Sequence, residues 1–351
     1  MDGLRNLSDV ALEPHPTLNL LTGTNGAGKS SVLEAIHCLS TGHSFRSRKP
    51  RELVARERET LTILGRMRDE NDEREHRIGL SRHRDGALDL RVDFEAVDSV
   101  APATRLLPVK ALSPDSHALV QEGPEERRRF LDWGVFHVEP LFLDSWRRFR
   151  RALSQRNRAL RDQRDDAEIV SWDEQLAETG TLVDGFRRAY VERLGAALSA
   201  RTRRLGRAVD TELRYRTGWA EGRSLASSLA DNLDHHRRMR TTTDGPHRGE
   251  LTLSSDGVPV RQTFSRGQQK MLVYLLHLAQ LDLMRESGGG EAVVLCDDLL
   301  SELDETNGED LVEQIMQVSC QLFVSGVSLK ELERLPHGSF HVELGSVTRR
   351  A

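Results

Sequence analysis

Short apolar runs separated by turn residues open the chain and predict strands. One run covers residues 10–12 and a second covers residues 18–21, with a proline-containing turn between them. A glycine-rich stretch follows, and after it apolar residues recur at helical spacing through about residue 39. The chain therefore starts as strand, loop and helix.

Three short segments at 61–67, 76–80 and 88–92 are separated by glycine- and aspartate-rich turns. They predict an antiparallel meander with one polar face. A further strand begins at Val109 and runs into a loop around Pro114. We expect this small sheet to belong to the same lobe as the first strand and helix.

The pattern changes at Pro124. From there to about residue 240, apolar residues recur every three or four positions among Arg, Asp and Glu. This spacing predicts a lobe of amphipathic helices inserted into the α/β unit. The lobe is far too short for a long coiled-coil arm, and its heptads are not sustained.

Strands and helices alternate again in the last part of the chain. The expected elements are strands at 250–253 and 258–260 joined by an Asp-Gly turn, a helix at 268–284, a strand at 292–296, a helix at 307–318 and a strand at 321–324. We therefore predict an α/β fold in three segments. They are an N-terminal part of the α/β lobe (1–122), the inserted helical lobe (123–245) and a C-terminal part of the α/β lobe (246–351).

Composition narrows the function classes. The net charge of the 351 residues is −5, so only a local basic patch is available for nucleic acid. Five of the 50 basic residues are lysine and 45 are arginine, which a GC-rich coding sequence explains. The three cysteines are scattered, and neither a signal peptide nor a membrane-spanning run is found. We expect a cytoplasmic protein without a membrane partner.

The segment 23–30 reads GxxxxGK[ST] between the predicted strand and helix. Glycines let backbone N–H groups surround phosphate oxygens, and the helix N-terminus adds a positive dipole end. Lys29 would reach the β- and γ-phosphates of ATP as a catalytic residue, and Ser30 would ligate Mg²⁺. The expected nucleotide-binding residues of this segment are Gly23, Thr24, Asn25, Gly26, Ala27, Gly28, Lys29, Ser30 and Ser31.

Two acids follow the apolar run 292–296. A strand that ends beside a phosphate loop is where a magnesium-binding aspartate belongs, so Asp297 is assigned to the metal. Asp298 would orient or deprotonate the attacking water. Ser265, Gly267 and Gln268 open the helix predicted at 268–284, and such a helix start also favours an anion.

Two basic segments remain open between alternatives. Arg5 and the neighbouring Asn6 lie ahead of the first strand, where an arginine either touches the nucleotide or is solvated surface. The basic loop 42–51 either meets phosphates of ATP or DNA or is solvated surface.

The order of these motifs resembles that of the ABC-type ATPases. Ser265–Gln268 would be the signature, 292–298 the Walker B segment and 301–304 the D-loop. The resemblance implies an ABC-type head with an antiparallel β-subdomain and a helical lobe. It also implies an ATP-dependent homodimer, in which Ser265 and Gly267 act on ATP held by the Lys29 of a partner.

More selective segments resemble the RecF family of bacterial recombination mediators, over about residues 4–324. They are SFRS at 44–47, RRRFLDW at 127–133, QRN at 155–157, GPHR at 245–248 and SELD at 301–304. The resemblance implies a cytoplasmic protein of recombinational repair and of the SOS response. Such a protein dimerises with ATP on gapped DNA or at junctions of single- and double-stranded DNA, hydrolyses ATP slowly and assists RecR- and RecO-type mediators in loading a recombinase.

The chain departs from the ABC pattern at several positions. Asp298 stands where a glutamate is usual, and 323–328 holds no switch histidine. Gln121 and Asp115 both remain candidates for the Gln-loop, and we expect further residues upstream of Met1. The alternatives are another SMC- or Rad50-like head, an ABC transporter subunit, or an ATP-gated dimerisation module whose hydrolysis is incidental.

Overall fold

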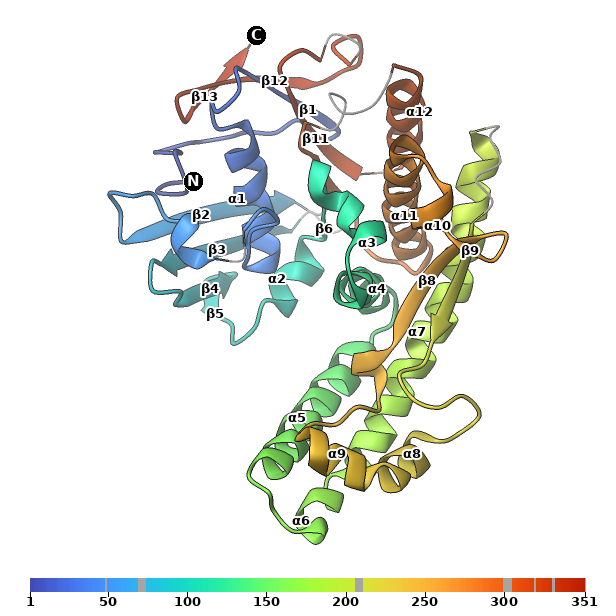
Figure 1. Cartoon of the computed structure of the whole chain (residues 1–351). Helices are drawn as coiled ribbons and strands as arrows, with labels where there is room; N and C mark the ends of the chain where they lie inside the picture. Colours follow the sequence, from blue (N-terminus) through green and yellow to red (C-terminus); the bar gives the residue numbers. More distant parts are fainter. Residues whose placement is uncertain are drawn as a thin grey trace. The chain divides into compact units, whose positions relative to one another are not determined.

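A computed structural model describes residues 1–47, 49–68, 74–205, 211–298, 305–318, 320–329 and 332–350, with the backbone alone at 305 and 306. The chain forms two units (Figure 1). Unit 1 comprises Met1–Ser116 and Gly290–Ala351, and unit 2 comprises His117–Gly289. The division into three segments stays a prediction.

A six-stranded sheet forms the centre of unit 1. In spatial order its strands are β13 (Ser346–Arg350), β12 (Gly338–Glu343), β1 (Leu18–Thr22), β11 (Cys320–Gly326), β10 (Ala292–Cys296) and β6 (Val109–Leu112). All neighbours run parallel except β12 and β13, which form a hairpin. Every residue of β10 is buried, as expected for a parallel strand with both faces covered.

Helix α1 (Lys29–Thr41) packs against strands of both sheets of unit 1 (Figure 1). It ends at Gly42, whose left-handed backbone lets its N–H donate to the Cys38 carbonyl. The second sheet is antiparallel and consists of β2 (Thr60–Arg68), β3 (Glu75–His83), β4 (Leu88–Val92) and β5 (Glu95–Ala96). Leu33 of α1, Ile63 of β2 and Leu295 of β10 share one buried apolar core. The other described helices of unit 1 are α2 (Ala101–Leu106) and α12 (Glu305–Met316). Two 3₁₀ turns, η1 (Pro50–Glu52) and η2 (Pro114–His117), also belong to it or to its border with unit 2.

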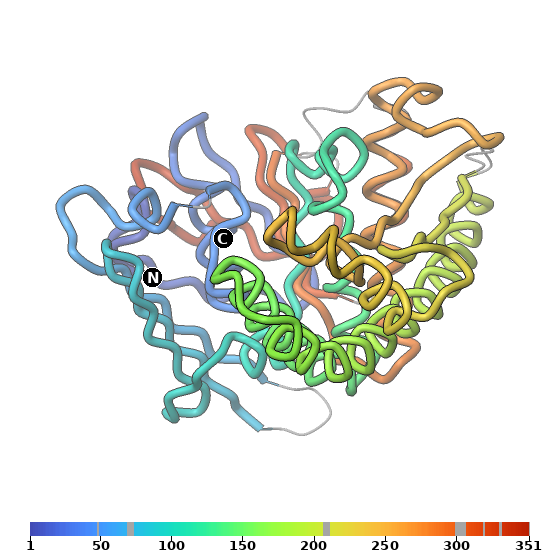
Figure 2. Tube along the Cα trace, turned by 60° about the horizontal axis from the view of Figure 1, so that its bottom comes forward, coloured from blue at the N-terminus to red at the C-terminus, as the bar shows by residue number. Residues whose placement is uncertain are grey.

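Unit 2 is built around the long helix α7 (Asp173–Arg204), with α5 (Phe142–Arg161) beside it in both views (Figures 1 and 2). Its other helices are α3 (Ala118–Gln121), α4 (Pro124–Val138), α6 (Asp166–Val170), α8 (Leu225–Asp231), α9 (Leu233–Met239), η3 (Pro246–Arg248), α10 (Val260–Thr263) and α11 (Arg266–Glu286). A small antiparallel sheet joins β7 (Glu212–Arg216), β8 (Glu250–Ser255) and β9 (Val258–Pro259). Among the described residues, no helix is both long and apolar enough to cross a membrane.

The expected fold class is confirmed: a mixed α/β unit carries the phosphate loop, an antiparallel sheet and a helical insertion. The prediction of a strand at residues 10–12 is wrong. The first residues of the chain take the place beside β2, where Asp2 pairs with Thr62, and Val10 folds back to donate its N–H to the Met1 carbonyl.

The helical stretch expected up to residue 240 is also wrong at β7, which pairs with β8. The strand expected at 258–260 stops at Pro259, whose nitrogen has no N–H to donate, and Val260 begins α10. The sequence patterns gave no sign of α2, β12 or β13.

Candidate functional site

At Gly23 and Gly28, the loop between β1 and α1 has a backbone that only glycine accommodates. Gly28 has φ 117°, in the left-handed region. Gly23 has φ 158°, and a Cβ there would lie 2.2 Å from the Val342 carbonyl oxygen. From the turn between β12 and β13, the N–H of Gly345 donates to the Ala27 carbonyl and braces the loop. The glycines thus hold a tight strand-to-helix turn.

Lys29 lies inside this loop. Its side chain is almost fully buried, at 5% exposure, and Nζ donates to the carbonyl oxygens of Gly23 at 2.9 Å and of Thr24 at 3.1 Å. The two carbonyls hold the ammonium in a fixed place at the start of α1. A fixed, partly desolvated cation interacts strongly with anions.

The two acids after β10 meet the first turn of α1. Asp297 is 7% exposed, and its Oδ1 accepts hydrogen bonds from Ser30 Oγ at 2.7 Å and from Ser325 Oγ at 2.8 Å. Asp298 has a left-handed φ of 49°, and its N–H donates to Ser325 Oγ at 3.0 Å. The structure therefore brings the assigned metal and water residues together in unit 1.

The neighbours Ser30 and Asp297 offer only oxygen donors, which suit a small hard cation such as Mg²⁺. No cluster of three or more His, Cys, Asp or Glu that could hold a metal occurs among the described residues. Mg²⁺ is usually bound by one or two carboxylates together with substrate phosphates. The residues present therefore fit this ion.

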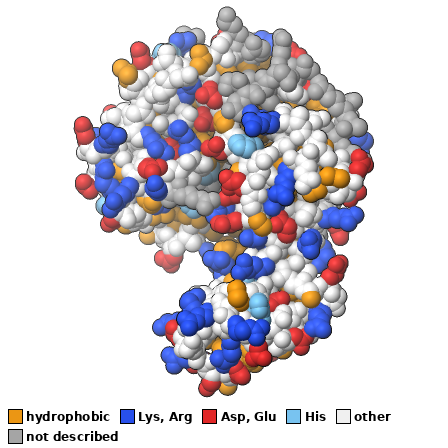
Figure 3. Space-filling view, in the orientation of Figure 1, with side chains coloured by type: hydrophobic (Ala, Val, Ile, Leu, Met, Phe, Trp, Pro, Cys, Tyr) orange, Lys and Arg blue, Asp and Glu red, His pale blue; other side chains and the backbone are white. Residues whose placement is uncertain are grey.

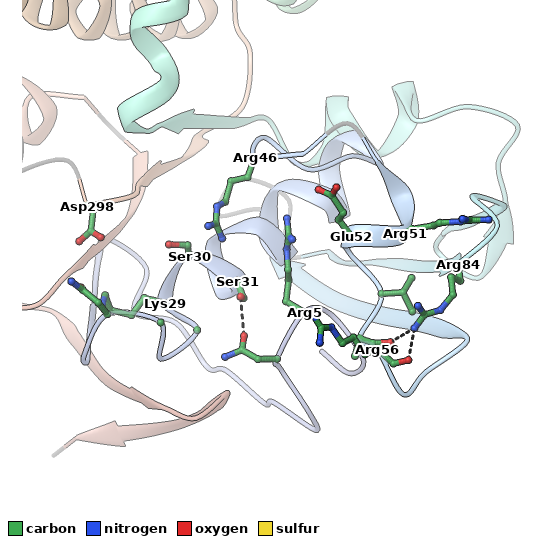
Figure 4. A pocket seen from close by; sticks show the side chains of 16 residues that line it. Arg5, Lys29, Ser30, Ser31, Arg46, Arg51, Glu52, Arg56, Arg84 and Asp298 are labelled. Atoms are coloured by element: carbon green, nitrogen blue, oxygen red, sulfur yellow. Dashed lines mark hydrogen bonds between the residues drawn. The ribbon is translucent and has the colours of Figure 1, made fainter.

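A pocket of about 860 Å³ opens beside the loop (Figure 4). Lys29, Ser30 and Asp298 lie at one end of it, with Arg46 and Arg5 in the middle. Its lining residues are Arg5, Asn6, Asn25, Gly26, Gly28, Lys29, Ser30, Ser31, Arg46, Arg51, Glu52, Val54, Ala55, Arg56, Arg84 and Asp298. Five arginines and a lysine make it a site for an anion.

The two basic segments left open by the sequence both line this pocket. Arg5 donates two hydrogen bonds of 2.9 Å to the buried carboxylate of Glu34, and these raise the pKa of the arginine. Arg46, from the loop 42–51, lies 4.0 Å from the same carboxylate and extends toward Ser30 (Figure 4). Asn6 accepts a hydrogen bond from Ser31 Oγ at 3.0 Å.

Sequence reasoning missed Arg56 and Arg84 at the pocket and Ser325 behind the acids. Arg84 donates to the carbonyls of Arg56 at 2.8 Å and Arg58 at 2.9 Å, so it supports the backbone of the wall. No local motif marks these residues. For Ser325 the available signal was its place near the end of β11, next to the strand that ends in the two acids.

The expected signature residues lie in unit 2, at the start of α11. Ser265 is the N-cap: its Oγ accepts from the Gln268 N–H at 3.3 Å, and its own N–H donates to Gln268 Oε1 at 2.8 Å. Ser265 and Gln268 are exposed and Gly267 is half-buried. The D-loop expected at 301–304 lies outside the described residues.

The motifs RRRFLDW and GPHR meet inside unit 2. Arg187 of α7, only 2% exposed, forms two hydrogen bonds to Asp132 and donates to the Pro246 carbonyl at 2.6 Å. Burial raises the pKa of Asp132 and lowers the pKa of His247 to about 4. His247 donates from Nε2 to the Thr242 carbonyl at 3.0 Å. These contacts hold unit 2 together.

A protein-family model and curated proteins both match nearly the whole chain. A family model described as RecF/RecN/SMC N terminal domain matches residues 1–341. The DNA replication and repair protein RecF of Stutzerimonas stutzeri is 38% identical over 353 residues, with 99% of this chain and 95% of that protein covered. The protein of the same name from Thioalkalivibrio sulfidiphilus is 40% identical, with 98% and 96% covered.

Solved structures also match the chain over nearly its full length. The recombination mediator protein RecF in its RecF-ATP structure is 26% identical, with a TM-score of 0.89 and coverage of 100% of this chain and 96% of that one. A Smc head bound to the C-winged helix domain of ScpA is 14% identical, with a TM-score of 0.57 and coverage of 99% and 94%. The second likeness concerns the fold alone.

Proposed function

Because the chain belongs to the RecF family, we propose that it is an ATP-dependent DNA-binding protein of recombinational repair and replication restart. The observation that carries this proposal is the pocket beside the glycine loop, where Lys29 and Ser30 of the loop lie at the same end as Asp298. ATP binding closes a dimer on gapped or junction DNA, and slow hydrolysis releases it. The dimer would assist RecR- and RecO-type mediators, in the cytoplasm.

For nucleotide binding, the β- and γ-phosphates of ATP take the place of the two carbonyls that Lys29 now contacts. Ser30 and Asp297 would hold Mg²⁺, which supplies positive charge to the phosphate oxygens. Asp298 orients the attacking water or accepts its proton. Arg46 points toward Ser30 and adds a second cation in the middle of the pocket (Figure 4).

Dimerisation would use the exposed start of α11. The backbone N–H groups at a helix N-terminus favour an anion, and Ser265, Gly267 and Gln268 present this end to solvent. In the proposed dimer they contact the γ-phosphate of ATP bound by the partner. Nucleotide is then part of the interface, so its presence sets the oligomeric state.

For DNA we propose an arginine face on helix α5, consisting of Arg147, Arg151, Arg158 and Arg161. These four exposed residues fall within an arc of about 80° and extend over about 21 Å of helix. The helix holds seven arginines and a single acid in 20 residues, whereas α7 holds six arginines and five acids in 32 residues. Lys and Arg side chains gather over this part of unit 2 in Figure 3.

The test is sedimentation and DNA binding of the purified chain, with a labelled gapped duplex and with or without Mg-ATP. We expect a dimer only with ATP and tighter DNA binding by that dimer. The pair Arg147→Glu and Arg151→Glu should weaken DNA binding about tenfold or more and flatten its salt dependence, with ATP-dependent dimerisation retained.

A matched control is the pair Arg214→Glu and Arg216→Glu on β7, which changes the same charge on exposed residues of unit 2. It should bind DNA as the wild type does. Equal losses in the two pairs would contradict the arginine face. A wild-type chain that stays monomeric with ATP bound would contradict the dimer.

Asp298→Asn tests whether hydrolysis is used. Because the amide cannot accept the proton of water, we expect ATP turnover to fall by about 100-fold or more. The ATP-bound dimer should persist on DNA, measured as the release rate after dilution. Release at the wild-type rate would favour the second candidate, a dimerisation module whose hydrolysis is incidental.

A further inference from the structure

Ser325 connects the two acids from the neighbouring strand. It is the last residue but one of β11, and its side chain is 1% exposed. Its Oγ donates to Asp297 Oδ1 at 2.8 Å and accepts from the Asp298 N–H at 3.0 Å. A hydroxyl has a single proton, so these two contacts fix its orientation completely.

Each of the two hydrogen bonds stabilises a feature that is unfavourable by itself: a buried carboxylate and a left-handed backbone. Asp297 is buried, and a buried carboxylate without hydrogen-bond donors is costly. Asp298 has a backbone φ of 49°, in the left-handed region that residues other than glycine seldom adopt. One hydroxyl therefore stabilises the side chain of the first acid and the strained backbone of the second.

Ser30 is the other hydroxyl on Asp297 Oδ1, but the two serines differ in position. Ser30 lines the pocket, whereas Ser325 is absent from the pocket lining and reaches the acids from the sheet. Ser325 is thus placed to act through Asp297 and Asp298, without touching the ligand. It also lies in the stretch 323–328, which contains no histidine.

We propose that Ser325 is a positioning residue, which holds the Asp297 carboxylate and the Asp298 backbone in one fixed geometry toward the pocket. This rests on the proposed function, because it assigns Asp297 to Mg²⁺ and Asp298 to the attacking water. Without the Ser325 hydroxyl, Asp297 keeps one described donor, Ser30, and the Asp298 N–H loses its acceptor. The loss falls on metal-dependent steps and spares the contacts of Lys29.

The test compares Ser325→Ala with Ser40→Ala and Ser325→Thr. Ser40 is a buried serine of α1 whose hydroxyl has no hydrogen-bond partner among the described residues, so its replacement removes the same atom without breaking a described bond. Ser325→Thr keeps the hydroxyl. Each variant is titrated with a fluorescent ATP analogue in EDTA and in Mg²⁺, and its ATP turnover is measured.

We expect Ser325→Ala to lower kcat about tenfold or more and to raise the Mg²⁺ concentration needed for half-maximal effect. Affinity for the analogue in EDTA should be unchanged. Ser40→Ala should match the wild type, and Ser325→Thr should recover most of kcat. An unchanged kcat and Mg²⁺ dependence in Ser325→Ala would overturn the proposal.

Hydrogen exchange of the ligand-free protein gives a readout that needs neither metal nor activity. The peptide that contains Asp298 should exchange faster in Ser325→Ala than in Ser40→Ala, because the Asp298 N–H has lost its acceptor. Equal exchange would refute the contact even where Ser325→Thr fails to fold. If the wild type binds no nucleotide, the proposed function fails, and this exchange result still decides the contact.

Discussion

Replacing Lys29 with alanine is expected to weaken ATP binding by about 100-fold or more and to abolish ATP-dependent dimerisation. Lys29 is 5% exposed and its ammonium donates to two loop carbonyls, so its charge is already largely desolvated and fixed in place. A water molecule in an alanine variant would not replace that charge. Titration with a fluorescent ATP analogue and sedimentation with Mg-ATP measure the two effects.

Lys49→Ala is the matched control. It removes the same charge from the basic loop 42–51, but Lys49 is exposed and paired with Glu52 at 3.4 Å. We expect nearly wild-type binding from this variant, since exposed pairs contribute little. Comparable affinities of Lys29→Ala and the wild type would remove the glycine loop from the nucleotide site.

Ser265→Arg is expected to eliminate ATP-dependent dimerisation while each monomer still binds ATP. The substitution places a large cation at the start of α11, where the helix dipole disfavours it and where the proposed partner nucleotide would lie. Sedimentation with Mg-ATP measures the dimer, and the fluorescent analogue measures binding by the monomer.

The control for this variant is Ser224→Arg. Ser224 caps α8 and accepts from the Ser227 N–H at 3.1 Å, so both variants lose a serine cap worth about 1 kcal/mol. Only Ser265 belongs to the proposed interface. Dimers in Ser265→Arg as abundant as in Ser224→Arg would show that α11 does not contact the partner.

Mixing Lys29→Ala with Ser265→Arg tests action between protomers. In a head-to-tail dimer of the two, one composite site carries both substitutions and the other carries neither. We therefore expect the mixture to form dimers that neither variant forms alone. A mixture that stays monomeric would mean that both residues serve the same protomer.

Local patterns were enough to predict the parts of the site that are continuous in sequence. The glycine loop lies between β1 and α1 as expected, and the five-residue strand that precedes Asp297 has the predicted bounds. These features depend on periodicity, glycine geometry and capping, which neighbouring residues determine. The roles of Lys29, Ser30, Asp297 and Asp298 stay predictions until the variants are measured.

Contacts between distant segments were beyond such patterns. The pairing of β7 with β8, of β12 with β1 and of β13 with β12 depends on which strand edges remain available, and no short stretch of sequence records this. The same holds for Arg5 with Glu34 and for Arg46 at the pocket. The sequence pointed to Arg5 and to the loop 42–51, which contains Arg46. It left Arg5 open between nucleotide and solvent, and the loop open between phosphates of ATP or DNA and solvent.

The fold class, the phosphate loop and the order of motifs that marks the family could all be predicted from the amino-acid sequence, because each is a local pattern or a linear order. The bridge from Ser325 to two consecutive acids of another strand, and the pocket shared by five arginines, became visible only in the folded protein. The physical reason is that burial and hydrogen-bond geometry arise from packing segments far apart in the chain. A single hydroxyl contributes to a site only once the sheet has placed it there.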